Sequence, residues 1–101
     1  MEYNKLVRDK IPEIIMNQQE VPVTCVLNDE EFNCELKKKL VEEVNEYLES
    51  EEVEELTDIM EVLYALAKTK GYSETELENL RIKKCNERGK FDEKIFLIKK
   101  K

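Results

Sequence analysis

The sequence predicts an all-α fold, a helical hairpin or bundle of about four helices per chain, completed by oligomerisation. Three observations indicate this fold. Only two glycines and two prolines interrupt the 101 residues, apolar side chains recur at helical spacing, and capping residues separate the periodic stretches. Apolar and charged residues each make up 41% of the chain. We expect a single domain, residues 1–101, whose modest core other copies complete.

A short first helix is expected from Pro12, a residue that an opening helical turn tolerates, toward Gln19. The runs 21–27 and 95–98 are instead rich in β-forming residues, and Pro22 marks the first of them as an edge strand. These two runs could pair as a short two-stranded β ribbon.

Two longer helices follow. Asn28 or Asp29 can cap a second helix that runs to about Ser50, and a tight turn there begins a third helix that ends at Gly71. The apolar arc of the second helix consists of Phe32, Leu36, Leu40, Val44 and Tyr47, and that of the third consists of Leu56, Ile59, Leu63 and Leu66.

Acidic residues interrupt both apolar arcs. Glu43 falls in the middle of the second helix's arc and Glu46 lies at its edge, while Glu55 and Asp58 take similar places on the third helix. In an antiparallel hairpin these four carboxylates would converge between the helices. Because such a concentration of negative charge cannot be buried without compensation, a cation is expected there.

The chain has no His and no CxxC pair, so the ligands of this cation would all be oxygens. Such a set suits Mg²⁺, with Mn²⁺ as the alternative, and disfavours zinc. Helical geometry turns Glu42 away from the centre, toward the surface. The competing interpretation is that glutamates in a chain with 24 acids merely form solvated helix faces.

A fourth helix is predicted from Ser73, in a capping box with Glu76, to Gly89. Its basic side chains line up on one side, and a second basic cluster precedes the first helix. These cations are Arg81, Lys84 and Arg88, and Lys5, Arg8 and Lys10. Next to a metal site they would neutralise a polyphosphate, although for any one of them pairing with a surface Glu is an equal alternative.

Charge and cysteine usage restrict the partners. The net charge of −7 repels polymeric nucleic acid and anionic membranes, and no apolar run is long enough to span a bilayer. Three cysteines, an odd number, argue against a disulfide framework. We therefore expect a cytoplasmic protein with no nucleic-acid or membrane partner.

Several motifs resemble those of a known family. Glu42-Glu43-Val44-Asn45-Glu46 and Glu55-Leu56-Thr57-Asp58 resemble the E-E-x-x-E and E-x-x-D motifs of the MazG-like, all-α nucleoside triphosphate pyrophosphohydrolases. The opening residues 3–12 (YNKLVRDKIP) and the closing residues 87–91 (ERGKF) are similar to those of its small phosphoribosyl-ATP pyrophosphohydrolase-like branch. Together these matches span nearly the whole chain.

The resemblance implies a Mg²⁺-dependent enzyme that splits a nucleoside triphosphate into a monophosphate and pyrophosphate, with a role in nucleotide-pool house-cleaning. Active sites in this superfamily are assembled from two or more subunits, which implies a homo-oligomer. The metal-ligand positions fall on Glu43, Glu46, Glu55 and Asp58, and the phosphate-contacting positions on Lys84 and Arg88.

Further roles follow from the chemistry that such a reaction needs. Glu46 or Glu42 is the candidate general base. The other candidate substrate contacts are Arg81, Lys5, Arg8 and Asn4. Two alternatives remain: hydrolysis of phosphoribosyl-ATP in histidine biosynthesis, and a non-enzymatic helical module for oligomerisation or partner binding.

Overall fold

The computed structural model describes residues 3–101 and contains four α-helices and no β-strand within that range. The helices are α1 (Ile11–Asn17), α2 (Asp29–Ser50), α3 (Val53–Thr69) and α4 (Glu74–Arg88). The all-α class is confirmed, and each helix begins and ends close to its predicted limits. No helix in the described range is both long and apolar enough to cross a bilayer.

Side-chain caps fix the starts of α2 and α4. Asn28 Oδ1 accepts a hydrogen bond from the Glu31 amide at 2.8 Å, and the Glu31 carboxylate accepts one from the Asn28 amide at 3.3 Å. Ser73 and Glu76 form the same reciprocal pair, with both distances 3.1 Å. These capping boxes satisfy amide groups that have no partner inside their helices, and a cap of this kind stabilises by about 1 kcal/mol.

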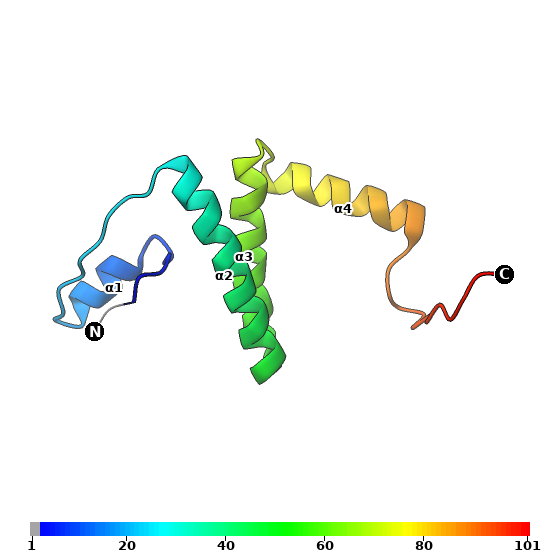
Figure 1. Ribbon diagram of the computed structural model, residues 1–101, viewed down its shortest axis with the longest axis horizontal. Helices are drawn as coiled ribbons and strands as arrows, with labels where there is room; N and C mark the ends of the chain where they lie inside the picture. Colours follow the sequence, from blue (N-terminus) through cyan, green and yellow to red (C-terminus); the bar gives the residue numbers. More distant parts are fainter. Residues whose placement is uncertain (1–2) are drawn as a thin grey trace.

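A two-residue turn reverses the chain between α2 and α3. Glu51 has a left-handed backbone, with φ of 58°, and donates its amide to the Tyr47 carbonyl at 2.7 Å. The Ser50 hydroxyl accepts a hydrogen bond from the Glu52 amide at 3.2 Å. The short turn makes the two helices antiparallel, so that they pack along their length (Figure 1).

The hydrophobic core of this hairpin is small. Leu36 of α2 and Val62 of α3 are its buried apolar residues, 3% and 7% exposed in the described chain. The other apolar residues predicted to face the core from α2 are half-buried, namely Phe32, Leu40, Val44 and Tyr47. On α3, Leu56 and Leu63 remain 40% and 42% exposed, because the stripe that faces α2 runs through Val62 and not through them.

The other two helices extend from the hairpin and do not cover it. Figure 1 shows α1 on one side of the hairpin and α4 pointing away on the other. Gly71, with φ of 83°, turns the chain between α3 and α4, in a conformation that glycine adopts without strain. The Cα radius of gyration is 17.7 Å, against about 13 Å for a compact chain of this length. A single copy therefore leaves much apolar surface uncovered.

The predicted β ribbon is absent from the described residues, and that part of the prediction is wrong for a single copy. Segments 21–27 and 95–98 are extended but form no strand. Figure 1 places them at opposite ends of the longest axis of the molecule, along which the chain extends 61 Å. Paired strands lie about 4.8 Å apart, so these two cannot meet in this arrangement.

Candidate metal centre

Five carboxylates gather where α2 and α3 face each other. Glu42, Glu43 and Glu46 of α2 can bring one oxygen each within 4.8 Å of one another, and Glu43 does the same with Glu55 and Asp58 of α3. Glu43 belongs to both groups because it lies at the contact between the helices. The hairpin thus brings all four predicted metal-ligand residues to one region, with Glu43 joining the two halves.

These five residues form an acidic cluster, and Glu43 is its buried member. Its side chain is 9% exposed, and its Oε1 lies 3.3 Å from Lys39 Nζ, one helical turn earlier on α2. Its Oε2 is buried with no hydrogen-bond partner among residues 3–101. A buried carboxylate oxygen without a donor is costly, so this atom is the strongest indication that the site accommodates a cation.

The surroundings of Glu43 act on its protonation. Burial raises the pKa of the Glu43 carboxyl above its ordinary value, and the nearby Glu46 carboxylate raises it further. Lys39 opposes this by favouring the charged form. Because the pKa is raised overall, Lys39 does not fully offset the cost of the charged form of Glu43.

Among residues 3–101, three cations contact the acidic cluster. Lys39 bridges Glu43 and Glu42, with its Nζ 3.5 Å from Glu42 Oε2. From the segment before α1, Lys5 Nζ lies 3.4 Å from Glu42 and Arg8 Nη1 lies 3.2 Å from Asp58. Three cations against five carboxylates leave a negative excess.

The negative excess falls on two particular side chains. Within residues 3–101, no ion pair involves Glu46 or Glu55. Glu42 lies nearer to the others than the helical geometry predicted, and its contacts with Lys5 and Lys39 hold it there. Lys39 was missed by the sequence analysis, although its i, i+4 spacing to Glu43 could have indicated it.

Of the predicted substrate contacts, the structure brings Lys5 and Arg8 to the acidic cluster. Asn4 precedes them with a left-handed backbone, φ of 45°, and its side chain is exposed. This bend in the chain lies directly before Lys5. The cationic side chains of Lys5 and Arg8 are therefore next to the carboxylates.

The cations of α4 are not brought to the acidic cluster within one copy. Arg81 forms an ion pair with Glu78 on the same helix, and this pair lowers the pKa of the Glu78 carboxyl. Lys84 and Arg88 are exposed, and neither takes part in an ion pair within the described range. The reason is the direction of α4, which leaves the hairpin after Gly71 (Figure 1).

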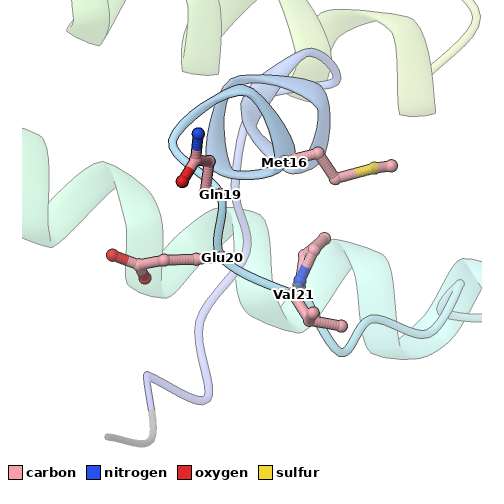
Figure 2. A pocket seen from close by; sticks show the side chains of 5 residues that line it. Met16, Gln19, Glu20 and Val21 are labelled. Atoms are coloured by element: carbon pink, nitrogen blue, oxygen red, sulfur yellow. The ribbon is translucent and has the colours of Figure 1, made fainter.

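Two surface hollows lie away from the acidic cluster. The first hollow has a volume of about 490 Å³ and lies between the end of α1 and the chain that follows it. It is lined by Met16, Gln19, Glu20, Val21 and Pro22. Figure 2 shows the side chain of Met16 pointing away from those of Gln19 and Glu20, which lie on the other side. A second hollow, of about 380 Å³, follows one side of α4 and includes Arg81 and Lys84.

The donor set of the acidic cluster fits a hard divalent cation. All five side chains offer carboxylate oxygens, which Mg²⁺ and Mn²⁺ prefer, and Oε2 of Glu43 has no hydrogen-bond donor among residues 3–101. Searches against protein-family models, curated proteins and solved structures gave no match to this chain.

Proposed function

We propose that this protein is a Mg²⁺-dependent nucleoside triphosphate pyrophosphohydrolase of the MazG-like type, which releases a nucleoside monophosphate and pyrophosphate. One observation carries the proposal: Glu43, the buried centre of the E-E-x-x-E motif, meets Glu55 and Asp58 of the second motif and retains an oxygen with no donor among residues 3–101. The two motifs would thereby form one site.

Glu43, Glu46, Glu55 and Asp58 would hold Mg²⁺, or Mn²⁺ in its place. The bound ion supplies Lewis-acid polarisation of the phosphoryl oxygens and makes an attacking water more acidic. The protein's own task is then to accept the proton of that water. A carboxylate that is not fully used as a metal ligand can do this, and Glu46 suits the task better than Glu42. Glu46 is exposed and forms no ion pair in the described chain, whereas Glu42 is already bound by Lys5 and Lys39.

Cations beside the acidic cluster would bind the polyphosphate. Arg8 and Lys5 are in place, each on a carboxylate of a different helix, and the phosphate oxygens of a substrate can replace those carboxylates as their partners. Asn4, which directly precedes Lys5 in the chain, would also contact the substrate. Lys84, Arg88 and Arg81 would contact the leaving pyrophosphate from a second copy of the chain, because α4 points away from the acidic cluster of its own copy.

Self-association is part of the proposal. Beside a core of two buried apolar residues, α3 exposes a second apolar stripe at heptad-like spacing. The stripe consists of Val53, Leu56, Met60 and Leu63, with exposures from 40% to 66%. Burying it against another copy would complete the hydrophobic core. The three free cysteines fit a reducing cytoplasm, where such an enzyme would remove unwanted nucleotides from the pool.

The test is pyrophosphate release from a panel of nucleotides with Mg²⁺ or Mn²⁺. Glu43→Gln and Asp58→Asn each replace one ligand oxygen by an amide and should lower the rate by about 100-fold or more, with the helical circular dichroism unchanged. Glu61→Gln, the same change on an exposed α3 residue outside the acidic cluster, should leave the rate unaltered. Normal turnover by Glu43→Gln would refute the metal site.

Two rival functions are separated by the same panel. Preferential turnover of phosphoribosyl-ATP would assign the protein to histidine biosynthesis. The exposed stripe on α3 also favours a non-enzymatic interaction module, for which no nucleotide would be consumed under any metal condition while self-association or partner binding survives Glu43→Gln.

A further inference from the structure

Two apolar segments have no partner within the part of the chain that the structure describes. Segment 21–27 exposes Val21, Val23 and Val26 by 88%, 96% and 99% of their surface, and residues 95–98 are each between 71% and 88% exposed. Both are extended, and across residues 3–101 neither forms a backbone hydrogen bond. Extended backbone next to β-branched and aromatic side chains is suited to strand pairing.

The residues around the two segments have opposite charge. Segment 21–27 is flanked by Glu20 on one side and by Asp29, Glu30 and Glu31 on the other, with no cation from 20 to 31. Segment 95–98 is flanked mainly by lysines, Lys90, Lys94, Lys99, Lys100 and Lys101, against Asp92 and Glu93. The two therefore attract each other, and two copies of the same segment would repel.

The two segments cannot satisfy each other within one copy, because they lie at opposite ends of a molecule 61 Å long (Figure 1). They can do so between two copies placed side by side in opposite directions. A two-fold axis then brings segment 21–27 of each copy to segment 95–98 of the other, so that two equivalent ribbons form.

We infer that this chain forms a dimer by exchanging strands: residues 95–98 of one copy pair with residues 21–27 of the second. A lone two-stranded ribbon is only marginally stable, so the ribbons add to the burial of apolar helix faces between the copies. The inference specifies the self-association proposed above and is independent of nucleotide hydrolysis.

Cross-linking with native Cys25 tests the pairing directly. Cys25 lies within segment 21–27 and is exposed. One population of the full chain keeps it as the sole thiol through Cys34→Ser and Cys85→Ser. The second has all three cysteines replaced by Ser and receives one thiol, at 95, 96, 97 or 98 in turn, for example Phe96→Cys. Lys70→Cys, at the exposed end of α3, serves as the matched control.

After the two populations are mixed and oxidised, mass spectrometry should find a mixed disulfide dimer for at least one of the four positions, at several times the yield of Lys70→Cys. If none of the four positions gives a higher yield of mixed dimer than Lys70→Cys, the inference is overturned. A disulfide that closes within one chain when Cys25 and Phe96→Cys are placed in the same polypeptide would also overturn it, because that result would restore the ribbon to a single copy.

A second measurement uses a backbone donor. Leu97→Pro removes one N–H from the ribbon, whereas Leu97→Thr keeps the donor and a β-forming side chain. Residues 95–98 are exposed, so neither change should unfold the hairpin. In sedimentation, Leu97→Pro should raise the dimer dissociation constant by about tenfold relative to Leu97→Thr. Equal constants, or a monomeric wild type, would contradict strand exchange.

Discussion

The two faces of the α2–α3 hairpin reverse the usual distribution of polarity. Between the helices, the carboxylate of Glu43 is 9% exposed, while on the outer side of α3 Val53 and Met60 are 66% and 47% exposed. A folded chain gains by burying apolar groups and loses by burying charge. Within residues 3–101, a single copy therefore has two unsatisfied regions of different kinds: a buried carboxylate on the inside and exposed apolar side chains on the outside.

The largest effect expected from this comparison concerns the core between the helices. Leu36→Ala truncates a buried side chain that is 3% exposed and should lower the free energy of unfolding by about 2–5 kcal/mol, at every protein concentration. Leu63→Ala, the same substitution on the exposed stripe, should cost much less in dilute solution. Its cost should grow with protein concentration as self-association buries the stripe.

Urea unfolding at two protein concentrations measures both variants. A Leu63→Ala penalty that is independent of concentration would mean that the stripe stays exposed in solution. A Leu36→Ala penalty below that of Leu63→Ala would show that the packing between α2 and α3 does not dominate stability.

A smaller effect of opposite sign is expected inside the acidic cluster. Without divalent cations, Glu43→Gln removes a buried charge and should raise the free energy of unfolding by on the order of 1 kcal/mol. Glu61→Gln should change it by less than about 0.5 kcal/mol. Adding Mn²⁺ should stabilise the wild type and not Glu43→Gln, so that the order of stability reverses. Thermal unfolding with and without Mn²⁺ measures this. If wild type and Glu43→Gln keep the same order of stability in both conditions, the result argues against a cation site.

The same variant has a defined pH dependence. Because the pKa of Glu43 is raised in the folded protein, the folded state binds this proton more tightly than the unfolded chain does. Below the ordinary value of 4.5 the carboxyl is protonated in both states and contributes nothing. As the pH rises from there through the raised pKa, the wild type loses stability that Glu43→Gln keeps.

Other carboxylates titrate in the same range, so the informative quantity is the difference in melting temperature between Glu43→Gln and wild type in metal-free buffer. It should be near zero below pH 4.5 and should grow toward neutral pH. A difference that shrinks with rising pH would mean that Lys39 over-compensates the Glu43 charge.

Local chemistry explains what the sequence could predict. Asn28 and Ser73 mark helix starts because their caps use residues three positions away. Glu43 could be placed inside the hairpin because helical periodicity and a short turn decide which way it faces. The direction of α4 depends on Gly71 and on packing that no periodicity encodes, so the distance of Lys84 and Arg88 from the acidic cluster could not be foreseen.

The failed prediction of an intrachain ribbon has the same origin. Strand propensity in 21–27 and 95–98 was readable, but pairing is a contact between distant parts of the chain, and its partner can belong to another copy. Likewise the contact of Arg8 with Asp58 joins residues 50 positions apart, and nothing in the spacing of either residue indicates it.

Arg8 provides the smallest expected effect and the finest test of the acidic cluster. Its ion pair with Asp58 joins side chains that are 61% and 38% exposed, and such pairs contribute about 0–1 kcal/mol to stability. Arg8→Gln should thus barely change the melting temperature. It should nevertheless tighten Mn²⁺ binding by about two- to fivefold, because Arg8 competes with the metal for Asp58. The KM for nucleotide should rise, because a phosphate contact is lost.

Lys10→Gln is the matched control. It removes the same charge from the same segment, at a residue that forms no ion pair in the described chain, so it separates direct competition from a general change in net charge. If Lys10→Gln tightens Mn²⁺ binding equally, the effect is long-range electrostatics; if only Arg8→Gln does, the segment before α1 supplies a counter-ion that the metal displaces and the substrate then recruits.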